Sequence, residues 1–230
     1  IMRTLSIIIP VYNEEKTVDT LIGRVVEAKT GEWKKQIIVI DDGSSDHTRD
    51  LLDKWKKQCE IILQDRNRGK GAAVVAGLGK ATGEIILIQD ADLEYDPADY
   101  LMLLAPFRDS RASVVYGSRF LGPHLSTMFF YSLGNKFVTF LTNILFNTNI
   151  TDMETGYKAF RRSVLKGITL RAQRFDFEPE FTAKVLLGGN QIYEVPISYY
   201  GRKFAEGKKL TWKDGIVAVI TLLRCRLGLE

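Results

Sequence analysis

The stretch IILIQDADLEYDP, residues 85–97, decides how this chain can fold. Its first four residues are all apolar and three are β-branched, which is typical of a short strand buried on both faces, as in a parallel sheet. The strand runs directly into four acids within seven residues, and Pro97 ends the run. Because the ligand crevice of an open α/β sheet lies at the carboxyl ends of its strands, the stretch predicts a parallel sheet with an acidic site at its edge.

The first two acids, Asp90 and Asp92, are suited to hold one divalent cation. Crowded carboxylates repel one another unless a cation lies among them. With only the small Ala91 between them, both side chains can reach one hard ion such as Mg²⁺. A solvated acidic loop that caps a helix beginning near Asp96 or Asp99 would use the same residues. The Asp-x-Asp pattern alone does not decide between the two interpretations.

Three more apolar strands are predicted upstream, at Leu5–Val11, Gln36–Ile40 and Glu60–Leu63, and helices are expected over 13–28, 45–58 and 72–81. Strands that alternate with helices of this length predict an α/β fold, a doubly wound and mostly parallel sheet with helices on both faces. The charged residues that follow the strands are then expected to converge at one rim: Asp41, Asp42, Asp65, Lys70, Asp90 and Asp92.

Two common phosphate-binding motifs are excluded. The loop Gly69–Gly71 lacks the upstream glycine of a P-loop, and no G-x-G-x-x-G fingerprint is present. The first strand is followed by Tyr-Asn-Glu-Glu, residues 12–15, whose carboxylates would repel a pyrophosphate at that helix end. The best remaining fit is a nucleotide-sugar site, in which the Asp-x-Asp holds a metal that bridges the diphosphate.

Composition limits the class further. The chain has 230 residues, enough for one large domain or a domain with a tail, and its 45% hydrophobic content argues against disorder. Its two cysteines match no metal or disulfide pattern, which favours a reducing, cytosolic setting. Neither a signal peptide nor an apolar run of transmembrane length is visible. The net charge is −1 over residues 1–150 and +5 over 151–230, so either a basic face for anionic lipid or phosphate, or scattered surface lysines, lies in the C-terminal third.

Four ordered segments carry a family resemblance: IIIPVYNEE, IVIDDGSSDHT, NRGKGAAVVAGL and ILIQDADLEYDP. They resemble the inverting family 2 glycosyltransferases with the GT-A fold, and more narrowly the branch that makes polyprenyl-phosphate sugars, including the dolichol-phosphate mannose and dolichyl-phosphate glucose enzymes. The resemblance covers nearly all of the chain. It implies Mg²⁺ or Mn²⁺ held by Asp90 and Asp92, with Glu94 as a third carboxylate where mannose synthases often have glutamine. We expect donor contacts from Pro10, Tyr12, Asn13, Glu14, Asp42, Asp65, Lys70 and Asp90.

We expect four catalytic residues. One is Asp92, and the other three lie in the second half of the chain. Gly117-Ser118-Arg119, after a predicted strand at 114–117, matches a family motif at the diphosphate rim, although Arg119 could equally be a surface arginine. The segment 152–160 resembles the family's acceptor loop, so that Asp152 would orient the acceptor. Arg202, in the basic stretch 198–210, matches a family arginine that reaches the donor diphosphate.

Two apolar helices point to the acceptor. The predicted helix 126–146 is apolar on most sides with a narrow polar stripe, so it is either buried or lies in a membrane interface. Within it, Asn135 and Lys136 are expected to meet an acceptor phosphate. The predicted helix 212–226 is too short to span a bilayer, but its tryptophan and flanking bases suit the headgroup level.

These observations predict an inverting, metal-dependent transfer of a hexose, with glucose the first choice, from a nucleotide sugar to a polyprenyl or dolichyl phosphate. A transferase that extends a glycan and a sugar nucleotidyltransferase are the alternatives. We expect a GT-A domain over 2–210, with a nucleotide-sugar half (2–118) and an acceptor half (119–210), and a membrane-associating helix over 211–230. The expected location is the cytoplasmic face of a membrane, with no nucleic-acid partner, and homo-oligomer formation stays open.

Overall fold

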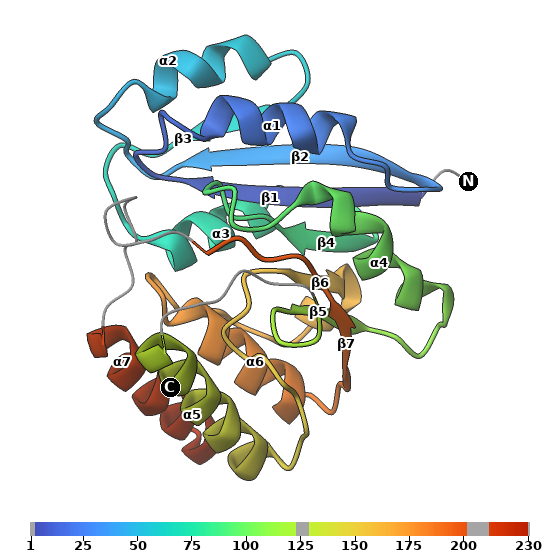
Figure 1. The fold of residues 1–230 in the computed structure, drawn as a ribbon, viewed down its shortest axis with the longest axis vertical. Coiled ribbons are helices and arrows are strands. Elements are labelled where there is room, and N and C mark those ends of the chain that lie inside the picture. Colours follow the sequence, from blue (N-terminus) through green and yellow to red (C-terminus); the bar gives the residue numbers. More distant parts are fainter. Residues whose placement is uncertain (1–2, 123–128, 202–211, 230) are drawn as a thin grey trace.

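A computed structural model describes residues 3–122, 129–201 and 212–229. Its centre is a seven-stranded sheet with the order β3-β2-β1-β4-β6-β5-β7 (Figure 1). Strands β1 (Arg3–Val11), β2 (Trp33–Asp41), β3 (Glu60–Leu63) and β4 (Ile85–Ile88) are all parallel. This half of the sheet confirms the doubly wound arrangement expected from the sequence.

The other half of the sheet is mixed. Strand β6 (Lys158–Arg161) runs antiparallel between β4 and β5 (Val114–Ser118), and β7 (Ile192–Pro196) pairs parallel with β5 at the edge. Pro196 therefore lies in an edge strand, where a residue that has no backbone N–H is tolerated. Strand β6 was missed within the expected acceptor loop, because its sequence KAFR is short and half charged. It becomes a strand only through pairing on both sides.

Helices cover both faces of the sheet. One face carries α1 (Val18–Glu27), α2 (Thr48–Leu52) and α4 (Tyr100–Leu104), and the other carries α3 (Lys70–Leu78) and α6 (Phe177–Leu187). Short 3₁₀ turns lie at Asp53–Trp55, Pro97–Asp99, Ala105–Arg108 and Arg162–Leu165. Successive strand residues pack to opposite faces, as Ile7 and Ile8 of β1 do, so the two layers together bury residues 5–9 of β1 completely.

Helix α3, expected over 72–81, begins at Lys70 and ends at Leu78, and it packs tightly against the sheet. A Cβ atom at Gly77 would lie 2.6 Å from a methyl carbon of Ile8 and 2.7 Å from one of Ile40. Only glycine at this position lets the helix approach the sheet so closely. The close approach brings the first residue of α3, Lys70, to the rim where β4 ends.

Two further helices form a separate layer (Figure 1). Helices α5 (Phe129–Phe146) and α7 (Trp212–Leu227) pack against α6 through a small cluster that includes Val138, Ala183 and Leu222. Away from this cluster, α5 exposes Phe129, Leu133, Phe137, Phe140 and Ile144. Within the described ranges, none of the helices is long and apolar enough to cross a membrane.

Candidate active site

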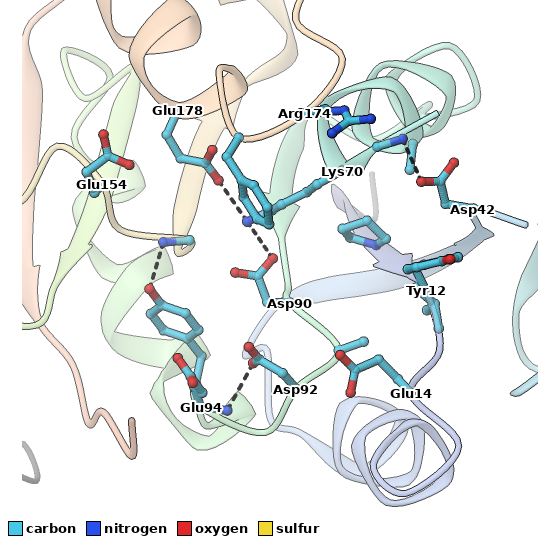
Figure 2. Close-up of a pocket in the computed structure, with 18 of the residues that line it drawn as sticks. Tyr12, Glu14, Asp42, Lys70, Asp90, Asp92, Glu94, Glu154, Arg174 and Glu178 are labelled. Carbon is cyan, nitrogen blue, oxygen red and sulfur yellow. Dashed lines mark hydrogen bonds and ion pairs between the residues drawn. The ribbon is translucent and has the colours of Figure 1, made fainter. Parts of the chain in front are cut away.

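A cavity of about 480 Å³ opens at the carboxyl ends of β1, β2 and β4 (Figure 2). It is bounded on the opposite side by the loop that precedes β6, the start of α6 and one side of α5. Its lining includes most of the expected donor and metal residues: Pro10, Tyr12, Glu14, Asp42, Lys70, Asp90, Asp92 and Glu94. The convergence of strand ends predicted from the sequence thus produces one continuous hollow.

Lys70 connects the two halves of the cavity. Its Nζ lies 2.7 Å from Asp90 Oδ1 and 2.7 Å from Glu178 Oε1, so one ammonium group is shared by an acid after β4 and an acid of α6. Burial acts to lower the pKa of Lys70, but the two carboxylates outweigh it and raise that pKa above the usual value. Lys70 is therefore a permanent cation at the centre of the site.

The acids after β4 are not gathered into a three-carboxylate cluster. Asp92 Oδ1 accepts a hydrogen bond from the Glu94 backbone N–H at 3.1 Å, whereas Glu94 Oε2 accepts one from the Tyr199 hydroxyl at 2.6 Å. In the part of the chain that the structure describes, no three His, Cys, Asp or Glu side chains lie close enough to hold a metal ion together. Glu94, the expected third ligand, instead accepts a hydrogen bond from Tyr199, so Asp90 and Asp92 stay the candidate pair of oxygen ligands.

On the donor side, Asp42 organises the glycine loop. Its carboxylate accepts hydrogen bonds from the backbone N–H groups of Arg68 and Gly69, at 2.8 and 2.7 Å. Burial raises the pKa of Asp42, partly offset by these two hydrogen bonds. Gly69 has φ +98°, and a side chain there would collide with the backbone of Gln173. Asp42 thus lines the cavity and also shapes the loop that leads into α3.

Three acids or amides of this half do not line the cavity. Asn13 was expected to contact the donor, but its Oδ1 accepts a hydrogen bond from the Ser45 backbone N–H and so supports the turn after β2. Asp41 is fully buried and bound to Arg49 at 2.6 Å. Asp65 is exposed, because β3 is the edge strand and its end lies away from β4. Of the strand ends that were expected to form the site, those of β1, β2 and β4 line the cavity, and that of β3 does not.

Arg119 and Asp152 form a buried pair. Asp152 accepts three hydrogen bonds from Arg119, from its backbone N at 3.0 Å, its Nε at 2.7 Å and its Nη2 at 2.7 Å. Asp152 has no exposed surface and does not line the cavity, whereas Arg119 does. Asp152 was expected to orient the acceptor itself, but its oxygens are used by Arg119. Its direct effect is on the position of that guanidinium group.

The predicted acceptor residues divide in the same way. Asn135 of α5 lines the cavity together with Tyr131 and Ser132. The neighbouring Lys136 is exposed and does not line it, and its Nζ lies 5.5 Å from the ring centre of Phe120, which does. Arg202, the fourth expected catalytic residue, lies outside the described residues.

Several cavity residues were not anticipated from the sequence, namely Tyr95, Glu154, Arg174, Glu178 and Tyr199. Glu178 follows Phe-Asp-Phe at the start of α6, where an acid also suits an ordinary helix N-terminus. The only feature of the sequence that could have indicated a site residue here was its position just after another acid, Asp176. Tyr95 and Tyr199 carried none, since each reaches the site through tertiary packing, their ring centres 5.3 Å apart.

A doubly wound sheet whose strand ends gather acids, a buried lysine and an arginine around one cavity is typical of the ligand site of an α/β enzyme. The comparison with protein families makes the class specific. The chain belongs to glycosyl transferase family 2, whose model matches residues 6–169, and it is therefore a glycosyltransferase.

Curated relatives cover most of this chain. A UDP-N-acetylglucosamine–dolichyl-phosphate N-acetylglucosaminyltransferase of Methanococcus voltae is 27% identical over 98% of this chain and 97% of its own length. A dodecaprenyl-phosphate galacturonate synthase of Rhizobium johnstonii is 26% identical over 89% of this chain and 61% of its own. An undecaprenyl-phosphate 4-deoxy-4-formamido-L-arabinose transferase of Salmonella paratyphi B is 28% identical over 90% of this chain and 63% of its own length. The chain thus spans less than two thirds of the latter two relatives.

Among solved structures, the chain resembles glucosyl-3-phosphoglycerate synthase from Mycobacterium tuberculosis. In a complex with Mn²⁺ and UDP-glucose that enzyme has a TM-score of 0.73 and 21% identity, covering 98% of this chain and 79% of the other. The likeness confirms the expected GT-A fold.

Proposed function

We propose that the protein transfers a hexose, with glucose as the first choice, from a nucleotide sugar to a polyprenyl or dolichyl phosphate, with inversion at the anomeric carbon. The names of all three relatives contain a lipid phosphate, while their sugars are N-acetylglucosamine, galacturonate and a formamido-arabinose. The relatives therefore support the class of acceptor more strongly than the identity of the sugar.

The observation that carries the proposal is the reach of the cavity from β4 to α5. One wall holds Asp90 and Asp92, and another holds Ser132 and Asn135 on the polar side of α5. Other sides of the same helix expose Phe137, Phe140 and further apolar residues. A phosphate that carries a long hydrocarbon chain needs a polar pocket beside an apolar surface, and α5 supplies both.

The donor half offers a fitting place for a divalent metal. Asp90 and Asp92 both line the cavity and present the carboxylate oxygens that hard cations prefer. Two other buried carboxylate oxygens, Glu154 Oε1 and Glu178 Oε2, have no hydrogen-bond donor among the described residues, so the cavity offers acceptor oxygens beyond those of Asp90 and Asp92. We infer that Asp90 and Asp92 hold Mg²⁺ or Mn²⁺. The bound ion would supply charge that stabilises the departing nucleoside diphosphate.

Other residues of the donor half would bind the nucleotide. Pro10, Tyr12 and Glu14 follow one another along the end of β1 and the turn beyond it, and all three line the cavity with Asp42. A carboxylate accepts hydrogen bonds from base N–H or ribose O–H groups, and a tyrosine ring packs against a base. We propose that these residues hold the base and ribose.

The acceptor half would then direct the attack. A phosphate oxygen forms the new bond to the anomeric carbon while the bond from that carbon to the diphosphate breaks on the opposite face. Because the acceptor phosphate is already anionic, a strong general base is less necessary than for an alcohol. Arg119 lines the cavity and is held in place by Asp152, so its guanidinium can stabilise anionic oxygens without reorganising.

We also infer that the protein binds the cytoplasmic face of a membrane peripherally, with residues 2–118 serving the donor, 119–210 the acceptor and 211–230 the membrane. Helix α7 exposes Ile216 and Ile220 together with the bases Lys213, Arg224 and Arg226. The protein should sediment with anionic vesicles at low salt and be released as salt rises. The same supernatant fraction at both salt concentrations would contradict this inference.

The function is tested with a panel of nucleotide sugars offered together with a polyprenyl phosphate or with a glycan acceptor. We expect the nucleoside diphosphate and a lipid-linked sugar to appear together, with a metal ion present, for one donor of the panel. Extension of the glycan without any lipid product would instead support the alternative transferase. Consumption of a sugar phosphate and a nucleoside triphosphate would indicate a nucleotidyltransferase.

A further inference from the structure

A fully buried glutamine comes immediately before the Asp90–Asp92 pair, and the transfer chemistry does not use it. Gln89 follows the four apolar residues of β4 and has no exposed surface. Its Nε2 donates to the Asp90 backbone oxygen at 3.0 Å. Its Oε1 accepts from the hydroxyls of Tyr100 at 2.8 Å and Tyr157 at 2.7 Å. A buried polar network in which each of these groups has a partner makes the local structure rigid, so Gln89 fixes the position of the groups that it binds.

The partners of Gln89 belong to three different elements. Tyr100 is the first residue of α4, and Tyr157 lies immediately before β6. Burial raises the pKa of both hydroxyls well above the usual value, so both stay protonated and act as donors. The backbone N–H of Gln89 donates to the Ile8 carbonyl of β1 at 2.9 Å. The point where β4 ends is therefore tied to β1, α4 and β6 through one residue.

The segment that holds Gln89 also confines the Asp90 carboxylate. Gly156 precedes Tyr157, and a side chain at position 156 would overlap Asp90 Oδ2. The other oxygen of that carboxylate, Oδ1, lies 2.7 Å from Lys70 Nζ. The hydrogen bond from Tyr157 to Gln89 thus keeps the backbone of residue 156 close to Asp90, and so it limits where the Asp90 carboxylate can lie.

The turn that follows Gln89 needs this support. Leu93 has φ +63°, in the left-handed region that favours glycine. A residue with a side chain is strained there and keeps this conformation only where its surroundings hold it. Next to Leu93, the Glu94 backbone N–H donates to Asp92 Oδ1 at 3.1 Å. The bond from Gln89 to the Asp90 carbonyl fixes the same turn at its beginning.

We propose that Gln89 is a positioning residue, which fixes the backbone at Asp90 so that Asp90 and Asp92 present their carboxylates to a divalent cation before it binds. This inference rests on the proposed function, because it takes these two acids to be the metal ligands. A residue that orients metal ligands raises the metal affinity, since less ordering is left for the moment of binding. A hydrogen-bond network that served only the packing of the core would stabilise the fold and leave the metal affinity unchanged.

The test measures the affinity for Mn²⁺ in the presence of UDP by calorimetry, together with the affinity for UDP without metal and the melting temperature. Gln89→Met removes all three side-chain bonds with little change in volume, and Tyr100→Phe and Tyr157→Phe remove one bond each. The matched control is Tyr116→Phe. Tyr116 is also fully buried, and its hydroxyl is 2.7 Å from the Thr182 hydroxyl, but it does not line the cavity.

We expect Gln89→Met to weaken Mn²⁺ binding about ten- to a hundredfold, as the loss of a residue that orients metal ligands does. Tyr100→Phe and Tyr157→Phe should weaken it by smaller factors, because each leaves the bond to the Asp90 carbonyl in place. Binding of UDP without metal should stay at the wild-type level. The control should lower the melting temperature and keep the wild-type Mn²⁺ affinity.

Wild-type Mn²⁺ affinity in Gln89→Met would overturn the proposal. If that variant does not fold, wild-type affinity in both Tyr100→Phe and Tyr157→Phe would overturn it instead. A control that loses as much Mn²⁺ affinity as the tyrosine variants would do the same, because the effect would then be a general loosening of the core. A wild type that binds UDP but no Mn²⁺ would contradict the proposed metal pair itself.

Discussion

Two segments of the molecule have the same pattern of acids and different surroundings. Asp90-Ala91-Asp92 follows the parallel strand β4, and Asp152-Met153-Glu154 precedes the antiparallel strand β6. In both, the first acid is paired with a cation, Lys70 or Arg119. Both acids of the first segment line the cavity, but only Glu154 of the second does. The spacing of two acids therefore does not define their chemistry; the element that carries them does.

The two cations differ in how firmly they hold their acids. Lys70 is a single ammonium group shared between Asp90 and Glu178, and it can yield Asp90 to a metal ion while keeping Glu178. Arg119 grips Asp152 through two parallel side-chain bonds and a backbone bond, a rigid geometry that lysine cannot reproduce. We infer that the first segment binds ligands and that Asp152 of the second segment maintains the shape of the site.

The largest effect is expected in the first segment. Asp92→Asn removes a proposed metal ligand and should lower transfer by about a hundredfold or more, because the metal contributes several kcal/mol to stabilising the leaving group. The fold should survive, since a residue at the rim supports little packing. The measurement is turnover with a matched unfolding curve, and Asp53→Asn, an exposed acid of the same half, is the control. If the Asp92 variant turned over near the wild-type rate, or the wild type kept full activity in excess chelator, the first segment would not be a metal-binding segment.

The second segment should respond first in stability. Asp152→Asn removes the buried charge that pairs with Arg119 and should lower the free energy of unfolding by about 3–5 kcal/mol. Arg119→Lys keeps the charge but loses the two parallel guanidinium bonds, and should lower it by about 1–3 kcal/mol. Since both changes disrupt one interaction, the double variant should lose less free energy of unfolding than the sum of the two single losses. Urea denaturation of the four proteins measures the coupling. Strictly additive losses would mean that Asp152 does not act through Arg119.

A smaller effect is expected beyond the second segment, at α5. Lys136→Ala should raise the apparent KM for polyprenyl phosphate about ten- to a hundredfold, as loss of a charge-assisted contact to phosphate would, and leave nucleotide-sugar binding unchanged. Lys136 lies one residue from Asn135 of the cavity, and the exposed Lys80 provides a control distant from α5. Unaltered acceptor kinetics would place the lipid phosphate elsewhere.

The smallest effect is expected in the pH dependence of stability at Glu154, the second acid of the second segment. The pKa of Glu154 is raised in the folded protein, chiefly by burial, so the folded state binds its proton more tightly than the unfolded state does. Stability contributed by that protonated form is lost as pH rises through the folded pKa. Glu154→Gln should therefore raise the melting temperature relative to wild type at pH 8, and by less at pH 5. A difference that grows toward low pH would contradict the cause given for the shift.

The parallel half of the molecule was predictable from the sequence for a physical reason. Each of its strands is apolar by itself and is followed immediately by polar residues, so strand ends such as Asp42 and Asp90 had to meet at one rim. This pattern does not predict the order of the strands in the sheet. Asp65, which follows the edge strand β3, was therefore wrongly placed beside β4. Asn13 was misjudged for a similar reason, since its partner at Ser45 is distant in sequence.

The mixed half was harder to predict. Strand β6 has no apolar pattern of its own, and the buried position of Lys158 arises because the carbonyls of its own loop surround its ammonium group. Helix α5 was predicted where the structure describes it, because eighteen residues of one helix carry their own periodicity. Contacts between distant residues, such as Tyr199 with Glu94, depend on the packed fold and leave no local signal.

The most direct test of the central claim is to identify the bond that the enzyme makes. The product formed from a nucleotide sugar and a polyprenyl phosphate would be isolated and its anomeric centre assigned by NMR with phosphorus coupling. The account predicts a sugar joined through its anomeric carbon to the lipid phosphate, with the configuration opposite to that of the donor. A retained configuration, or a sugar attached to any group other than the phosphate, would contradict it.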